Sequence, residues 1–231
     1  RSAEDYERTF ARKLTENEYF FNQQVGFLSL NIPLQADEVL AVAFQYAYNG
    51  KIYQVGEFSE GVALNPANGV QQILYLKLLK ATTQRTDLPI WDLMMKNVYS
   101  LGTFQLSREN FRLNVIYNDN SDGLKKINYL PVPASETMLD GTSIISILGL
   151  DRLDQRNDPY SDGIFDFVEG VTINSNSGRV FFPVREPFGS FLRSKFVDPN
   201  LANSFVFEQL YDSTRTAAQQ LPELNRYSLV G

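Results

Sequence analysis

The amino-acid sequence predicts an α+β fold dominated by β-structure, with mainly antiparallel sheets that are either open or packed as a β-sandwich. Short stretches rich in aromatic and β-branched residues recur along the chain, and Asn, Asp, Gly and Pro separate them. Helical patterns do not alternate with these stretches, as they would in a parallel βαβ fold. The chain is 43% hydrophobic and 13% aromatic over 231 residues, which provides enough apolar surface for a folded core.

The clearest predicted element is a β-hairpin over residues 39–58. Two apolar runs flank Asn49-Gly50, a pair typical of a type I′ turn, in which both central residues have positive φ. A two-residue turn places Tyr46 opposite Tyr53 and gives one face of the hairpin large apolar side chains. The other face carries mostly small residues. We therefore expect the hairpin to be covered on both sides, within a sandwich or another substantial domain.

Further strands are expected along the rest of the chain. Residues 111–117 alternate between apolar and polar side chains, which predicts one buried and one wetter face. Residues 118–123 have the composition of a turn. The other predicted strands lie within residues 19–30, 73–79, 143–150, 164–168, 171–173, 179–184 and 226–230.

About three peripheral helices are expected, each from a capping pattern. The first covers residues 2–14, with Ser2 as its cap. The second covers residues 87–102, where Asp87 precedes Pro89 and apolar residues at helical spacing indicate core packing. The third begins after Asp198 and runs through residue 211 or further.

We expect residues 1–231 to form a single soluble module with a weak internal boundary near residues 131–141. The chain begins at Arg1 rather than Met and contains neither a signal-peptide pattern nor an apolar run long enough for a transmembrane helix. These features predict a segment excised from a much larger chain, with no transmembrane span of its own.

The composition argues against the common kinds of catalytic site. The chain has no Cys, and therefore no disulfide, thiolate metal site or Cys nucleophile. It also has no His, the commonest general base and zinc ligand. A formal charge of −6 disfavours binding to nucleic acid. We expect no enzyme, and we assign no catalytic, cofactor-binding or metal-binding residue.

An acidic run from Asp151 to Asp166 leaves one metal alternative open. Asp158, Asp162 and Asp166 surround Gly163, and closely spaced Asp side chains around a glycine turn are typical of calcium loops. Their spacing differs from the EF-hand pattern, however, and Asp-containing turns account for the same composition. The sequence does not decide whether this run binds calcium.

A hydrolase that uses two carboxyl groups is a further alternative. Asp92, Glu109, Glu169 and Glu186 are all available, but the sequence singles out none of them. This alternative requires a cleft in which two carboxylates face each other.

Several long strings of the chain resemble one protein family. They are residues 37–46 (DEVLAVAFQY), 48–58 (YNGKIYQVGEF), 88–101 (LPIWDLMMKNVYSL), 162–170 (DGIFDFVEG), 178–189 (GRVFFPVREPFG) and 208–214 (EQLYDST). They are similar to the SprA family of gliding-motility proteins, called Sov in some members. The resemblance covers nearly the whole chain and is weakest over residues 60–72 and 131–142.

The resemblance implies a non-catalytic module of the outer-membrane translocon of the type IX secretion system. This translocon is a large single-chain β-barrel that exports folded cargo and gliding adhesins. The implied partners are secreted cargo, other secretion-system subunits and the rest of the barrel. The implied location is the outer membrane or cell surface. The resemblance does not decide whether the module faces the periplasm or the outside of the cell. The alternative is a carbohydrate-binding or adhesion β-sandwich module, marked by an exposed row of aromatic residues beside a bound calcium ion.

Overall fold

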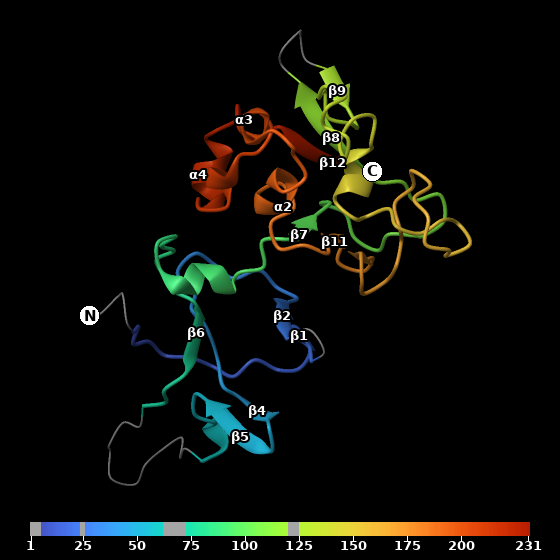
Figure 1. The fold of residues 1–231 in the computed structure, drawn as a ribbon. Coiled ribbons are helices and arrows are strands. Elements are labelled where there is room, and N and C mark those ends of the chain that lie inside the picture. Colours follow the sequence, from blue (N-terminus) through green and yellow to red (C-terminus); the bar gives the residue numbers. More distant parts are fainter. Residues whose placement is uncertain (1–5, 24–25, 62–72, 120–124) are drawn as a thin grey trace. The chain divides into compact units, whose positions relative to one another are not determined.

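The computed structural model describes residues 6–23, 26–61, 73–119 and 125–231. It confirms the predicted α+β class, since small antiparallel sheets of two or three strands dominate and the helices are short (Figure 1). The chain forms two compact units, Arg1–Met94 and Met95–Gly231. Residues 131–141 lie inside the second unit, and the predicted single module stays a prediction.

The first unit consists of three two-stranded antiparallel sheets. These are β1 (Tyr19–Asn22) with β2 (Phe27–Leu30), β3 (Leu40–Val42) with β6 (Lys77–Lys80), and β4 (Phe44–Tyr48) with β5 (Lys51–Val55). Two short 3-10 helices, η1 (Ser59–Gly61) and η2 (Pro89–Leu93), complete its regular structure as far as it is described.

Polar contacts hold much of the first unit together. The ammonium of Lys80, at the end of β6, donates to the backbone carbonyls of Gln35, Ala36 and Glu38 at 3.2, 3.1 and 2.5 Å. These bonds tie the loop before β3 to β6. Among the apolar side chains described in this unit, only that of Trp91 is buried, with 8% exposed. The described part of this unit therefore has little hydrophobic core of its own.

The second unit contains two three-stranded antiparallel sheets and all four α-helices described in the chain. One sheet has the order β10-β11-β7 (Ile173–Asn174, Arg179–Phe181 and Val98–Ser100), and the other has the order β12-β8-β9 (Tyr227–Val230, Asn114–Asp119 and Lys125–Ile127). The helices are α1 (Ile144–Ile147), α2 (Ser190–Arg193), α3 (Pro199–Ala202) and α4 (Arg215–Gln219), with a 3-10 helix, η3, at Glu208–Leu210.

Strand β8 lies at the centre of this unit's core. Leu113, Val115 and Tyr117 are buried, while Asn114 and Ile116 between them are only half-buried. The strand predicted over residues 111–117 is confirmed with shifted limits, since it begins at Asn114 and ends at Asp119, and the predicted buried face is confirmed. Burying alternate residues of one strand requires cover on one side, and the apolar face of α1 contributes to that cover.

Aromatic rings connect the elements of the second unit. They form a chain in which neighbouring ring centroids lie 4.8 to 5.7 Å apart. Such pairs add to the free energy gained from burial alone. Burial raises the pKa of Tyr227 well above its ordinary value, and the hydroxyl of Tyr227 donates to the carbonyl of Phe205 at 2.8 Å. In order, the rings belong to Tyr99, Phe182, Phe188, Tyr227, Tyr117, Phe205 and Phe196.

A buried carboxylate joins the 131–141 segment to the start of α3. Glu136 is 1% exposed and accepts hydrogen bonds from the backbone N–H groups of Val197 and Asp198 at 2.6 and 2.9 Å. Asp198 caps α3 as predicted, since its side chain accepts from the N–H of Asn200 at 2.8 Å. A buried carboxylate is tolerated here because two amides solvate it.

Two predicted helices are corrected. Residues 6–14 are not helical, and residues 2–5 lie outside the described part of the chain. Phe10 is 92% exposed, so this segment gains no packing that would stabilise a short helix. The helix predicted over residues 87–102 is only the 3-10 helix η2, which ends before Met94. Val98 to Ser100 instead form β7, because pairing with β11 outweighs the local helical pattern.

Two predicted strands are also corrected. Residues 143–150 contain helix α1, at Ile144–Ile147, and no strand, and a short apolar run does not distinguish a buried helix from a buried strand. Residues 164–168 form no strand. Their backbone makes other hydrogen bonds instead, including Asp166 N–H to the carbonyl of Leu150, sixteen residues earlier, at 2.9 Å. The third predicted helix ends at Ala202, and η3 and α4 follow it as separate short helices.

Other strands are confirmed with shifted limits. Residues 19–30 form a hairpin of two strands, although Val25 lies outside the described residues. The strand predicted at 73–79 begins at Lys77, and the strand predicted from 179 ends at Phe181. Of residues 171–173 only Ile173 is in a strand, and the extended C-terminal segment is β12. Of the predicted turn, Asn118 and Asp119 belong to β8, and residues 120–123 are not described.

Replacing the buried carboxylate tests the link between residue 136 and α3. We expect Glu136→Ala to lower the free energy of unfolding by about 2–4 kcal/mol, because two backbone amides lose their acceptor and a cavity remains where the buried side chain was. Glu109→Ala, at an exposed position, is the control and should change it by less than about 0.5 kcal/mol. Urea unfolding of both variants measures the difference, and equal stabilities would contradict the assignment.

Candidate interaction surface

The β4–β5 hairpin has the turn and the register that the sequence predicts. Asn49 and Gly50 both have positive φ, at 50° and 73°, as a type I′ turn requires. Tyr46 lies opposite Tyr53, and Tyr48 lies opposite Lys51 across the turn. The local sequence therefore determines which side chains share a face.

One face of this hairpin is a row of aromatic rings. The rings of Tyr46 and Tyr53 stack across the strands, with centroids 5.2 Å apart and planes at 16°. Phe44 extends the row along β4, with its centroid 6.1 Å from that of Tyr46. These side chains are exposed: Tyr46 is 48% and Tyr53 is 40% accessible.

The expectation that both sides of the hairpin are covered is wrong for the described chain. Every residue of β4 is exposed, and on the second face Ile52 is 76% accessible. The small residues serve another purpose at the base of the hairpin. A Cβ on Gly56, which has φ +75°, would lie 3.1 Å from the Cβ of Ala43. Gly56 thus permits close approach of the two strands and does not indicate a second layer.

We call the exposed aromatic side chains on this one face of β4 and β5 the hairpin surface. Isolated exposed apolar residues are normal on soluble proteins, but a contiguous group marks a binding surface. A two-stranded hairpin is also marginally stable by itself. The hairpin surface consists of Phe44, Tyr46, Tyr48 and Tyr53, and Ile52 is exposed on the other face.

The acidic run is organised by Asp151, which is 2% exposed. Its carboxylate accepts from the hydroxyls of Ser146 and Ser161 at 2.5 and 2.6 Å. It also accepts from the backbone N–H groups of Asp162 and Gly163 at 3.1 and 3.0 Å. Four donors therefore compensate this buried charge, and they fold residues 161–163 onto the end of α1.

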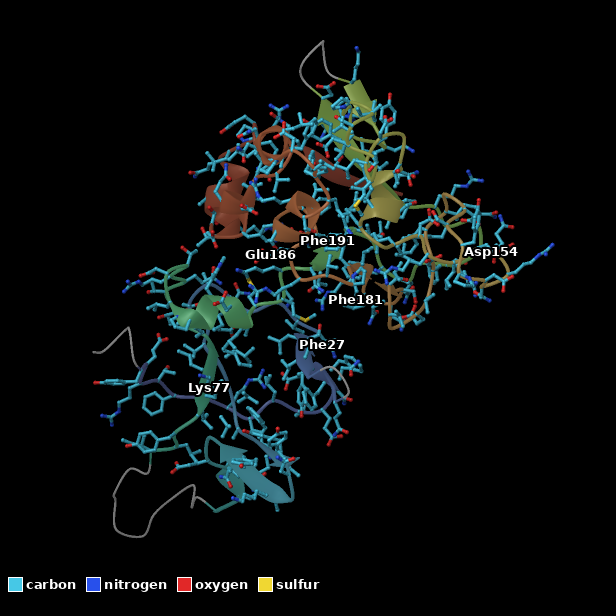
Figure 2. The ribbon with its side chains drawn as sticks, viewed as in Figure 1. Phe27, Lys77, Asp154, Phe181, Glu186 and Phe191 are labelled. Carbon is cyan, nitrogen blue, oxygen red and sulfur yellow. The ribbon has the colours of Figure 1, made fainter. Side chains whose placement is uncertain are left out.

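The other aspartates of the run also bind backbone amides. Asp154, near the end of an extended loop in Figure 2, accepts from the N–H groups of Arg156 and Asp158 at 2.7 and 2.9 Å. Asp162 accepts from Ile164 N–H at 3.0 Å. Asp166 accepts from Arg152 N–H at 2.6 Å, and burial raises the pKa of its carboxyl group.

These contacts favour the turn interpretation of the acidic run. Within the described ranges, no group of three or more Asp and Glu side chains is placed to hold a metal ion. Asp151, Asp162 and Asp166 do lie close enough to interact electrostatically, but their hydrogen bonds are directed at the loop itself. The calcium loop is therefore not among the arrangements that this geometry supports.

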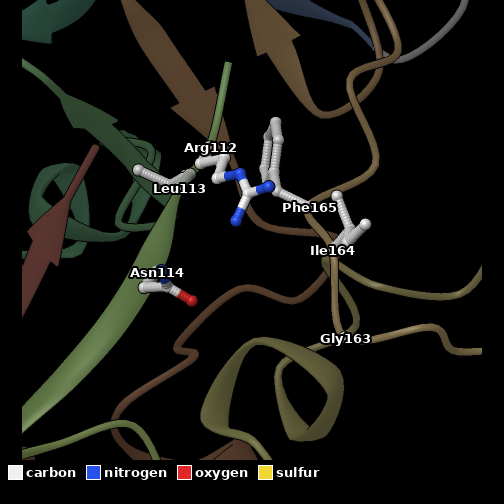
Figure 3. Close-up of a pocket in the computed structure, with 6 residues that line it drawn as sticks. All are labelled: Arg112, Leu113, Asn114, Gly163, Ile164 and Phe165. Carbon is white, nitrogen blue, oxygen red and sulfur yellow. The ribbon is translucent and has the colours of Figure 1, made fainter. Parts of the chain in front are cut away.

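A small pocket lies between the start of β8 and the acidic run (Figure 3). It has a volume of about 160 Å³, and Arg112 and Asn114 line one side. Gly163, Ile164 and Phe165 line the other. Figure 3 shows that the side chain of Arg112 extends towards Phe165 and Ile164. The pocket is smaller than typical small-molecule sites.

The four acids considered for hydrolysis are not assembled into a site. Both carboxylate oxygens of Glu169 accept from the N–H of Ser175 at 3.1 Å. Glu186 accepts from the hydroxyl of Ser190 at 2.8 Å and lies 3.6 Å from Arg185. Glu109 is exposed, and Asp92 belongs to the other unit. The described structure thus gives no support to a two-carboxylate mechanism.

Two features of these sites are not predictable from the local sequence. The role of Asp151 depends on four donors at positions 146, 161, 162 and 163, which local composition does not connect. The exposure of the hairpin was missed because its apolar pattern is identical to that of a buried hairpin. The alternation that made Tyr46 and Tyr53 neighbours was the only available signal for the aromatic row.

Comparison with protein-family models and with curated proteins gives no match to this chain. In the part of the chain that the structure describes, no helix combines the length and the apolar character needed to cross a membrane.

The assignment of Asp151 as a structural carboxylate predicts a selective loss of stability. We expect Asp151→Asn to lower the free energy of unfolding by about 2–4 kcal/mol. The substitution replaces one accepting carboxylate oxygen by an NH2 donor, and all four groups that face residue 151 are donors themselves. Asp158→Asn, in the same run but exposed, should be nearly neutral. Thermal unfolding with and without calcium measures both effects. A rise in Tm on adding calcium to the unaltered chain would contradict this account.

Proposed function

We propose that this chain is a non-catalytic module of a large outer-membrane β-barrel translocon of the type IX secretion and gliding-motility system, and that it contributes to protein export. The SprA-like strings described above support this proposal. They include both strands of the hairpin, residues 37–46 and 48–58. The absence of His and Cys from the sequence favours a role that does not require catalysis.

The observation that carries the proposal is the hairpin surface. The first unit buries only Trp91 among its described apolar side chains, yet it holds a well-ordered aromatic row in the open. Since apolar surface is normally removed from water, this row is best explained by a protein partner. The partners we propose are secreted cargo, other secretion-system subunits and the rest of the barrel, at the outer membrane or cell surface.

One specific feature favours a second candidate, a carbohydrate-binding or adhesion module. Exposed aromatic rings in a row offer faces to sugar rings, and Tyr46 and Tyr53 are both accessible. Against this, the two rings stack on one another with planes at 16°, which occupies one face of each. The described acidic run also lacks a metal arrangement that would accompany such a site. We therefore place the translocon module first.

A photo-crosslinking amino acid at the tip of the hairpin tests the proposed function. It is introduced at Asn49 or Lys51 of the full-length protein in cells, and the captured proteins are identified by mass spectrometry. We expect crosslinks to cargo or to secretion-system subunits, because the tip adjoins the hairpin surface.

The matched control carries the same amino acid at Glu109, an exposed position in the second unit. The tip positions should yield export components that position 109 does not. Capture of unrelated surface proteins, together with glycan binding that Tyr53→Ala abolishes, would reject the translocon module in favour of adhesion.

A further inference from the structure

We propose that the outer edge of β4 binds one extended segment of a partner protein as a third antiparallel strand. This inference rests on the proposed function for the identity of the partner, but its geometry comes from the hairpin alone. The partner segment would alternate apolar and polar side chains and carry a carboxylate at the end nearest the turn.

The backbone of β4 has an edge available for pairing. In an antiparallel pair, successive residues direct their N–H and C=O groups alternately towards the partner strand and away from it. Because Tyr48 and Lys51 close the two-residue turn, Gln45 and Ala47 direct these groups outward from β4. The side chains of Gln45 and Gln54 form a hydrogen bond of 3.0 Å. This agrees with the assignment of Gln45 and Gln54 as a pair without backbone hydrogen bonds, because side chains are closest at such pairs.

The two edges of the hairpin differ in what lies beside them. Glu57, just beyond β5, donates its N–H to the carbonyl of Tyr75 at 2.8 Å, and its carboxylate accepts from Tyr75 N–H at 3.0 Å. The base of β5 is thus next to another part of the same chain. On the other strand, pairing of β6 with β3 stops at Val42, before β4 begins. In the described ranges β4 pairs with β5 alone.

An open edge of this kind selects the chemistry of its occupant. Outward N–H and C=O groups in a row are matched by the backbone of another extended chain, which is the basis of strand addition. Alternate side chains of the added strand would lie beside the aromatic row, extending its apolar surface across three strands. A third strand would also stabilise a hairpin that is marginal with two.

Charge gives the added strand a direction. Residues 44–55 contain one charged side chain, Lys51, and no carboxylate. The structure shows no ion pair for Lys51 with any described residue. An antiparallel strand along β4 begins near the turn, so an acidic residue at its start lies closest to this ammonium. A basic residue there is repelled.

Synthetic peptides test the edge directly on the 231-residue chain. The probe is an acetylated and amidated peptide, Glu-Thr-Val-Thr-Val-Thr-Val, in which Glu and the three Val side chains share one face as Lys51 and the aromatic row do. Its binding is followed by NMR chemical shifts of the chain. We expect weak binding that shifts the amide signals of Gln45 and Ala47. N-methylation of the peptide on alternate amides should weaken binding about tenfold or more, because it removes the backbone bonds and leaves the side chains unchanged.

Two proline variants provide matched controls within the hairpin. Gln45→Pro removes one outward N–H from β4, and Gln54→Pro removes the equivalent group from β5, while both spare the inward ladder. Only Gln45→Pro should weaken binding, again by about tenfold or more. Lys51→Glu should reverse the preference between the Glu peptide and one that begins with Lys. Equal effects of the two proline variants, or no effect of N-methylation, would overturn the assignment of the edge.

The same variants separate this inference from the proposed function. If Gln45→Pro leaves the crosslinks from Lys51 to export components unchanged, the strand-addition inference is wrong and the proposed function stands. If the peptide binds β4 but crosslinking captures no export component, the edge is real and the proposed function is wrong.

Discussion

The burial of one face of β8 is the constraint on which the second unit depends. Val115 and Tyr117 lie on that face, Leu113 continues it just before the strand begins, and all three must be covered if the strand is to leave water. Helix α1 contributes to this cover, and the aromatic chain through Tyr117 and Tyr227 connects β8 to β12 and to Phe205, which follows α3. The short helices and irregular loops of this unit are then held in place by packing, since none is long enough to be stable alone.

Two buried carboxylates hold irregular segments of the second unit against the ends of its helices. Glu136 accepts from two amides at the start of α3, and Asp151 accepts from four donors around the end of α1. In each case a segment without regular structure is tied to a helix terminus by a charge that the core has removed from water. Such groups contribute to a unique arrangement because an unpaired alternative leaves a charge uncompensated. The acidic character of residues 151–166 is thus a structural device in the second unit.

The first unit shows the opposite use of apolar residues. Its hairpin has the aromatic content of a core element, but Phe44, Tyr46 and Tyr53 lie in the open. The contrast explains which predictions succeeded. The turn at Asn49-Gly50 and the register that follows from it are local, so the sequence predicts both. The alternation along residues 111–117 correctly predicts the buried face, because that strand has cover on one side only.

The errors arose where distant residues decide the outcome. Val98 to Ser100 follow a helical pattern but pair with β11, which lies about eighty residues further along the chain. Isoleucines at positions 144, 145 and 147 fit a strand as well as a helix, and the surrounding core selected the helix. Whether the hairpin is covered is likewise not a local property, because it depends on what else is bound. The candidate surface was therefore visible in the sequence only as a hairpin, and its exposure required the structure.

The central claim is that the outer edge of β4, beside the hairpin surface, is open in the isolated chain and is paired with an added strand when the proposed partners are bound. Hydrogen–deuterium exchange at the amides of Gln45 and Ala47 tests it most directly, in the 231-residue chain and in full-length protein purified with its partners. The account predicts fast exchange at both amides in the isolated chain and at least about tenfold slower exchange in the full-length protein, since an added strand would hydrogen-bond these groups. Equally fast exchange in both forms would contradict it.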